Sequence, residues 1–167
     1  MLFHRDAVII IKNRIGYMDI NFKKSGKEPR ILVIEGEELL GEAICCGLRH
    51  YYCNVDWVKT DLAAWPLLLA KRFDVIILDL DLLGVLGEEL LKNIRSKNII
   101  TPVIIMNNCS SGYSLAKSLG IGADDYISKP FNLDDLCEHI CTLKKRRAFC
   151  VRPTGTVDDN RPSFKFN

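Results

Sequence analysis

The chain has 167 residues, of which 48% are hydrophobic and 26% charged, with a net charge of +2. This length allows one compact domain with tails, the near-neutral charge argues against a broad nucleic-acid or anionic-membrane surface, and no apolar run approaches the roughly 20 residues of a membrane span. Seven cysteines occur without a CxxC pair, which favours reduced thiols in a cytoplasmic protein over a disulfide framework or a zinc site.

The two ends of the chain differ in pattern from its middle. Residues 1–29 form a predicted N-terminal extension whose apolar run at residues 7–11 allows either an added strand or an irregular arm. Residues 148–167 are polar and contain two prolines and a glycine, which predicts an irregular C-terminal tail.

Between these ends, apolar runs alternate with segments of helical spacing. The predicted strands cover residues 31–34, 53–58, 74–80, 102–106 and 125–128. The predicted helices cover residues 38–50, 61–72, 87–97, 112–119 and 132–147, and we expect Asp61 and Asn132 to cap the second and the last of them. Continuous apolar strands indicate burial on both faces, which predicts a doubly wound parallel α/β fold.

Polar side chains follow the predicted strands, and in such a sheet the working site lies outside the carboxyl ends of the strands. These residues are Glu35, Gly36 and Glu37 after the first strand, Asp79 and Asp81 at the third, Asn107 after the fourth, and Lys129 after the fifth. Several acids and one lysine are therefore expected at a single edge.

Four segments carry a resemblance to a known family: RILVIE at residues 30–35, FDVIILDL at 73–80, TPVIIM at 101–106 and GADDYISKPF at 122–131. In this order and spacing, residues 30–147 resemble the receiver domains of two-component response regulators. The closest resemblance is to receivers that precede a winged-helix DNA-binding domain. It implies a flavodoxin-like (βα)5 fold with strand order 2-1-3-4-5.

The resemblance also implies roles for single residues. Asp79 matches the aspartate that accepts a phosphoryl group from a sensor histidine kinase, with Mg²⁺ held by acids after the first strand. Lys129 matches the lysine that pairs with the phosphoryl oxygens. Asn107 stands at the switch position, usually Ser or Thr, and Tyr126 matches the aromatic side chain that swings inward on activation.

The sequence departs from the family pattern at the metal. Gly36 stands where the family has the acid that binds Mg²⁺ directly. In the loop after Asp79, Leu83 and Leu86 replace the usual proline and acid. The remaining candidate ligands predict weak or absent Mg²⁺ binding, and they are Glu35, Glu37, Asp79 and Asp81.

Three functions fit these residues. The first is a degenerate receiver without enzymatic activity, which signals by dimerising or by docking on a kinase or another regulator. The second is a working phosphoacceptor in which Asp81 helps to hold the metal. The third is a haloacid-dehalogenase-type phosphatase, because Asp79 and Asp81 form a DxD motif. In that family the motif opens the fold, whereas here two strand–helix units precede it.

The resemblance further implies a dimer face made by the fourth helix, the fifth strand and the fifth helix. On this face His139 replaces a common arginine and Leu115 a common basic residue, and His139 has Asp125 as a candidate partner. The other charged positions there are Asp124, Asp135 and Arg146. Only about twenty residues follow the last helix, which predicts no direct binding of nucleic acid.

Overall fold

The computed structural model describes residues 28–82, 87–108 and 119–150. The elements in these ranges are β1 (Arg30–Ile34), α2 (Glu38–His50), β2 (Asn54–Val58), α3 (Asp61–Ala70), β3 (Val75–Asp79), α4 (Gly87–Ser96), β4 (Val103–Asn108), β5 (Asp125–Lys129) and α6 (Leu133–Cys150). Their order matches the predicted alternation. The predicted helix at residues 112–119 falls almost wholly outside the described ranges, as does the apolar run at residues 7–11.

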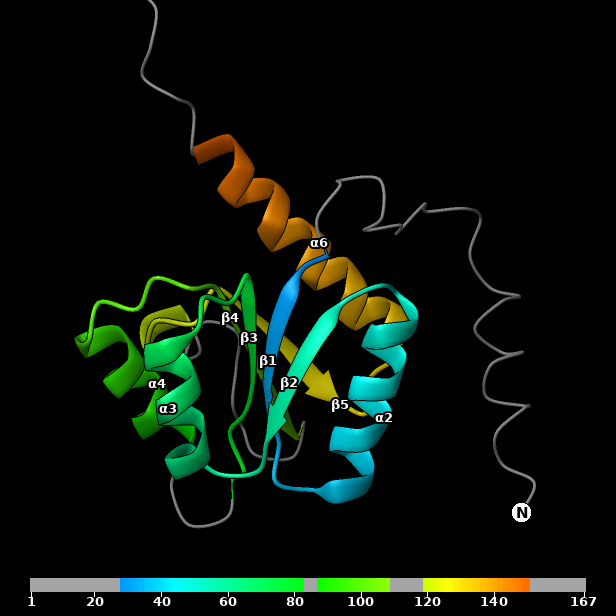
Figure 1. The fold of residues 1–167 in the computed structure, drawn as a ribbon, viewed down its shortest axis with the longest axis horizontal. Helices are drawn as coiled ribbons and strands as arrows, with labels where there is room; N and C mark the ends of the chain where they lie inside the picture. Colours follow the sequence, from blue (N-terminus) through cyan, green and yellow to red (C-terminus); the bar gives the residue numbers. More distant parts are fainter. Residues whose placement is uncertain (1–27, 83–86, 109–118, 151–167) are drawn as a thin grey trace, which may run out of the picture.

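The five strands form one sheet in the order β2-β1-β3-β4-β5, and every neighbouring pair is parallel. Helices α2 and α6 cover one face of the sheet, and α3 and α4 cover the other (Figure 1). This arrangement confirms the predicted doubly wound fold and its strand order. All carboxyl ends of the strands consequently meet at one edge.

The core lies in two layers, one on each side of the sheet. Along β1, Ile31 and Val33 pack in the layer with α2 and α6, whereas Leu32 and Ile34 pack in the layer with α3 and α4. All four side chains have no exposed area. This double-sided burial explains why the strands are continuously apolar.

Two helix starts differ in detail from the prediction. Thr60, not Asp61, caps α3, because its hydroxyl oxygen accepts a hydrogen bond from the backbone nitrogen of Ala63 at 3.2 Å. The prediction for Asp61 is therefore wrong, and Asp61 is the first residue of the helix. Asn132 accepts the first bond of α6 through its carbonyl, while its side chain donates to Asp135. Among the helices of the described ranges, none is both long and apolar enough to cross a membrane.

Candidate functional site

Side chains from β3, β5 and the turn after β1 meet at the carboxyl edge of the sheet. The Nζ atom of Lys129 lies 2.9 Å from Oε2 of Glu35 and 3.0 Å from Oδ1 of Asp79. Glu35 and Asp79 are buried, with 1% and 3% of their area exposed. One ammonium group therefore bridges two buried carboxylates.

The turn after β1 fixes the position of Glu35. Its Oε1 atom accepts a hydrogen bond from the backbone nitrogen of Glu37 at 2.8 Å. Its backbone carbonyl accepts one from the indole Nε1 of Trp57 at 3.0 Å. Both carboxylate oxygens of Glu35 are thus engaged, one by the turn and the other by Lys129.

Burial and hydrogen bonding have opposite effects on the pKa values of this cluster. Burial raises the pKa of Glu35 above its usual value, although hydrogen bonds from Glu37 and Lys129 oppose the shift. Burial tends to lower the pKa of Lys129, but its bonds to Glu35 and Asp79 outweigh that effect and raise it. Lys129 is therefore held in its charged form.

The loop after β3 contains Asp81, another of the predicted metal ligands. The backbone nitrogen of Asp81 donates to Oδ1 of Asp79 at 3.3 Å, and Oδ2 of Asp81 accepts from Nδ2 of Asn108 at 2.8 Å. Gly87 packs closely against this loop, because a Cβ atom there would lie 2.5 Å from the carbonyl oxygen of Asp79. The positions of Leu83 and Leu86 fall outside the described residues.

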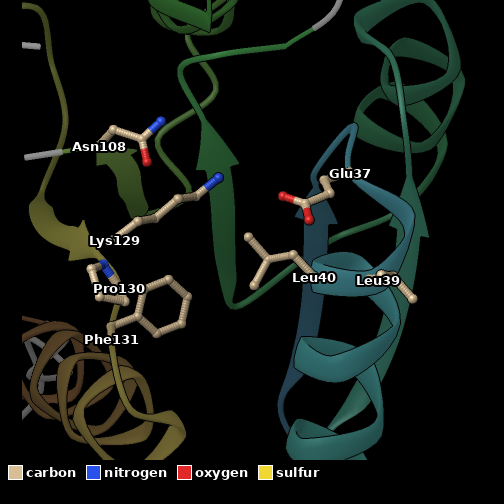
Figure 2. A pocket seen from close by; sticks show the side chains of 7 residues that line it. All are labelled: Glu37, Leu39, Leu40, Asn108, Lys129, Pro130 and Phe131. Atoms are coloured by element: carbon tan, nitrogen blue, oxygen red, sulfur yellow. The ribbon is translucent and has the colours of Figure 1, made fainter. Parts of the chain in front are cut away.

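Two cavities open at this edge. The first has a volume of about 350 Å³ and is lined by Glu35, Gly36, Glu37, Asp79, Asp81, Asn108 and Lys129. The second, of about 500 Å³, is lined by Glu37, Leu39, Leu40, Asn108, Lys129, Pro130 and Phe131. Figure 2 shows Leu40 and Phe131 facing one another across the second cavity, with Lys129 extending past them toward the end of β3.

Asn108 is a site residue that the sequence reasoning missed. It lines both cavities and bonds Asp81. The predicted residue, Asn107, is 2% exposed, and its side-chain oxygen accepts a hydrogen bond from the backbone nitrogen of Asn108 at 2.8 Å. Strand β4 runs two residues beyond the predicted end, and a second asparagine in sequence was the only available signal.

The structure also places the remaining candidate residues. Tyr126 is half-buried against the core layer of α3 and α4. The Nδ1 atom of His139 lies 2.6 Å from Oδ2 of Asp125, so these two residues pair within one chain. Asp124 pairs with Arg95 of α4 at 2.7 Å.

Two further residues of the predicted dimer face lie on α6. Asp135 accepts a hydrogen bond from the side chain of Asn132, and Arg146 is exposed. The position of Leu115 falls outside the described ranges.

Three of the predicted metal ligands are engaged by neighbouring side chains. In the part of the chain that the structure describes, no three Asp, Glu, His or Cys side chains converge on a position that would hold a metal ion. Glu35 and Asp79 are both bonded to Lys129, and Asp81 is bonded to Asn108. Gly36 lines the same cavity without a side chain.

Comparison with known proteins agrees with the fold. Residues 31–141 match the response regulator receiver domain family. The Francisella response regulator 1452 receiver domain is similar in structure, with a TM-score of 0.68, 30% identity, and coverage of 72% of this chain and 99% of that one. These matches do not favour the haloacid-dehalogenase-type phosphatase, in which the DxD motif opens the fold instead of following two strand–helix units.

Curated relatives agree as well. The chain is 37% identical over 117 residues to response regulator protein PmrA of Pseudomonas aeruginosa. The aligned residues make up 70% of this chain and 53% of that protein. It is 34% identical over 117 residues to transcriptional regulatory protein QseB of Escherichia coli O157:H7, with the same coverage of 70% and 53%. The chain thus spans about half the length of these relatives. The chain belongs to the response regulator receiver domain family of two-component signalling.

Proposed function

We propose that this receiver is degenerate: it signals by contact with other proteins, and its phosphorylation through Mg²⁺ is impaired. The observation that carries the proposal is the bridge from Lys129 to two buried carboxylates, at an edge where Gly36 supplies no acid. The proposed setting is the cytoplasm, with a sensor histidine kinase or another regulator as partner. The domain boundaries proposed are residues 1–29 for an extension, 30–147 for the receiver and 148–167 for a tail.

The electrostatic argument concerns what a divalent cation would have to displace. Mg²⁺ prefers six hard oxygen ligands in octahedral geometry and gives up its waters reluctantly. At this edge the ammonium of Lys129 already pairs with the carboxylates of both Glu35 and Asp79. A cation has to compete with that ammonium for the same oxygens, and it gains no third carboxylate from residue 36.

The proposed mode of action is docking or dimerisation. In the second cavity, Leu40 and Phe131 form an apolar wall beside the charges of Glu37 and Lys129. This combination of apolar and charged groups suits contact with a protein partner. The proposed homodimer surface includes β5 and α6; the helix predicted at residues 112–119, which the family resemblance adds to it, falls almost wholly outside the described residues. On this surface Asp125 and His139 pair within one chain. A dimer would therefore either replace this contact with contacts between chains or form around it.

The test is a titration of the full chain with Mg²⁺ in the presence of beryllofluoride, followed by NMR. We expect no saturable shift below roughly tens of millimolar Mg²⁺, about an order of magnitude weaker than an intact site. Gly36→Asp restores the missing acid and should tighten binding. Gly120→Asp adds the same charge at a position with open space around it, and should leave binding unchanged.

Phosphorylation gives the second readout. Acetyl phosphate should not label Asp79 at ordinary Mg²⁺, and the oligomeric state should be the same with and without beryllofluoride. An acyl phosphate trapped on Asp79, absent in Asp79→Asn, would contradict the proposal and favour a working phosphoacceptor. In that case Asp81→Asn would show whether Asp81 contributes to the metal.

A further inference from the structure

The two cavities at the carboxyl edge of the sheet are neighbours that share part of their lining. Glu37, Asn108 and Lys129 line both of them. Their volumes of about 350 and 500 Å³ are typical of ligand pockets. Figure 2 shows the side chains of Glu37 and Lys129 pointing toward one another from opposite sides of the larger cavity. The two cavities therefore form one composite site, which is polar at one end and apolar at the other.

The polar end of this composite site carries more acid than its lysine can balance. Its described lining includes four carboxylates, with the ammonium of Lys129 as the single cation, and the acids are Glu35, Glu37, Asp79 and Asp81. The lining remains acidic in excess even when Glu35 holds a proton. Because like charges crowded in a partly dry site repel one another strongly, this end of the site attracts a positive group.

Two of these carboxylates have oxygen atoms open to such a group. Asp79 is only 3% exposed, and its contacts with Lys129 and with the backbone nitrogen of Asp81 both go to Oδ1. Oδ2 of Asp79 accepts no hydrogen bond from a described residue, although the side chain lines the polar cavity. The carboxylate of Glu37 likewise makes no hydrogen bond or ion pair with a residue of the described ranges. A buried acceptor without a donor costs free energy, which a donor from outside the chain would recover.

A guanidinium group matches these acceptors better than a divalent metal ion does. Mg²⁺ demands octahedral oxygen ligands and gives up its water reluctantly, and Gly36 lines the cavity without a side chain. A guanidinium is planar and weakly hydrated, and it forms pairs of parallel hydrogen bonds with carboxylates. A lysine ammonium is a compact, strongly hydrated charge and lacks this fork of donors. The acceptors of the polar end therefore favour arginine.

The apolar end fits what lies beside a guanidinium in a protein. Leu40 and Phe131 face one another across the larger cavity (Figure 2), and Pro130 contributes to the same wall. The methylene groups of an arginine side chain pack on surfaces of this kind, as does an apolar side chain next to it in sequence. We propose that a partner protein inserts an arginine side chain into the composite site, with its guanidinium at Glu37 and Asp79 and a neighbouring apolar side chain in the larger cavity.

This inference names the chemistry of the docking partner and rests on the proposed function. A receiver that held Mg²⁺ tightly would occupy the same carboxylate oxygens and exclude the guanidinium. The two cations therefore compete, and impaired metal binding is what leaves the acids open to an arginine. The inserted side chain would also cover Oδ2 of Asp79, so that docking and phosphorylation of one chain exclude each other.

The first test is an NMR titration of the full chain with three probes. The first probe is the capped tripeptide acetyl-Leu-Arg-Phe-amide, and the second has citrulline, which has nearly the same shape without the charge, in place of arginine. The third is methylguanidinium, which lacks apolar neighbours. We expect the arginine peptide to bind with a dissociation constant on the order of a millimolar, and the other two probes at least about tenfold more weakly. No binding of the arginine peptide, or equal binding of any other probe, would overturn the inference.

The second test locates the binding site. Glu37→Gln and Leu40→Ala should each weaken binding of the arginine peptide several-fold. Glu42→Gln is the control for the charge, because Glu42 is exposed on α2 outside both cavities. Leu67→Ala is the control for the apolar wall, because Leu67 is also partly buried but packs on the other core layer. Both controls should bind as the wild type does, and equal losses in a variant and its control would mean that the peptide binds elsewhere.

Competition with Mg²⁺ separates this inference from the proposed function. Millimolar Mg²⁺, compared with NaCl of equal ionic strength, should leave the arginine peptide bound to the wild-type chain and displace it from Gly36→Asp. If the wild-type chain binds Mg²⁺ tightly, the proposed function fails and the inference fails with it. If the wild-type chain binds Mg²⁺ weakly and does not bind the arginine peptide, the proposed function stands and the inference alone is overturned.

Discussion

The ammonium of Lys129 lies 2.9 Å from the carboxylate of Glu35, although their strands are separated by β3 and β4. The contact joins opposite halves of the sheet across its carboxyl edge. It also gives the ammonium of Lys129 two acidic partners, and a phosphoryl group on Asp79 would have to share this ammonium with Glu35. The stability of the sheet and the charge state of the site are therefore linked through Lys129.

Removing Lys129 should destabilise the fold strongly. Lys129→Met leaves Glu35 and Asp79 buried without a counter-charge, and we expect the free energy of unfolding in urea at neutral pH to fall by about 3 kcal/mol. The loss should shrink in acid, where the carboxylates are protonated. Lys59→Met is the control, because Lys59 pairs at 2.7 Å with Glu38 on the open surface, and its effect should be small. Equal losses in the two variants would contradict a special role for the buried cluster.

The titration of Glu35 should appear in the pH dependence of stability. Since its pKa is raised in the folded chain, the folded state binds the proton more tightly than the unfolded state. Stability from this group is complete below the ordinary glutamate pKa of about 4.3 and declines as pH rises through the raised value. The slope is at most about 1.4 kcal/mol for each pH unit over which only the folded chain holds the proton. Urea midpoints measured across this range should decline in the wild type and be flatter in Glu35→Gln.

Glu38→Gln provides a comparison of opposite sign. Its hydrogen bond with Lys59 lowers the pKa of Glu38, so its contribution is present above the ordinary value and is lost as pH falls. Because this carboxylate is exposed, the effect should be slight. A wild-type midpoint that rises through the range where Glu35 titrates would show that the burial of Glu35 does not govern the cluster.

Gly87 should not tolerate a side chain. A Cβ atom there would lie 2.5 Å from the carbonyl oxygen of Asp79 and 2.7 Å from Cα of Leu80, and both are backbone atoms with little freedom to move. We expect Gly87→Ala to lower the free energy of unfolding by about 1 to 3 kcal/mol. Gly120→Ala, at a position with nothing within 4 Å, should be neutral or slightly stabilising. A neutral Gly87→Ala would mean that the loop after β3 relaxes freely.

Arg95 should not be replaceable by lysine. Its guanidinium donates to the carbonyl oxygens of Gly122, Ile99 and Thr101 and to the carboxylate of Asp124, at 2.7 to 2.9 Å. A single ammonium cannot reach all four acceptors. We expect Arg95→Lys to cost about 2 kcal/mol in a thermal or urea unfolding measurement.

Arg49→Lys is the matched control for that substitution. Arg49 donates one side-chain bond, to the carbonyl oxygen of Val55 at 3.2 Å, so the change should matter little. If the two variants lose equal stability, the four-way contact of Arg95 is not what holds the end of α4 to the start of β5.

The sequence was enough to predict the layers and the meeting of Asp79 with Lys129. Both follow from apolar runs that must be buried on two faces, and from the rule that parallel strands end at one edge. The presence of Glu35 at the same edge was also expected, but its direct bond to Lys129 was not, because that bond depends on side-chain reach across two strands. Asn108 was missed because the predicted strand ended at residue 106, whereas β4 continues to Asn108.

The indole of Trp57 has a consequence of its own. Its Nε1 donates to the backbone carbonyl of Glu35, whose carboxylate receives Lys129, and the chain has only one other tryptophan, Trp65 on α3. Intrinsic fluorescence of Trp57 therefore reports rearrangement of the turn after β1, and Trp65 reports changes at α3. Replacing either tryptophan with phenylalanine leaves one tryptophan. The fluorescence of that variant then reports on one region alone, either the turn after β1 or α3.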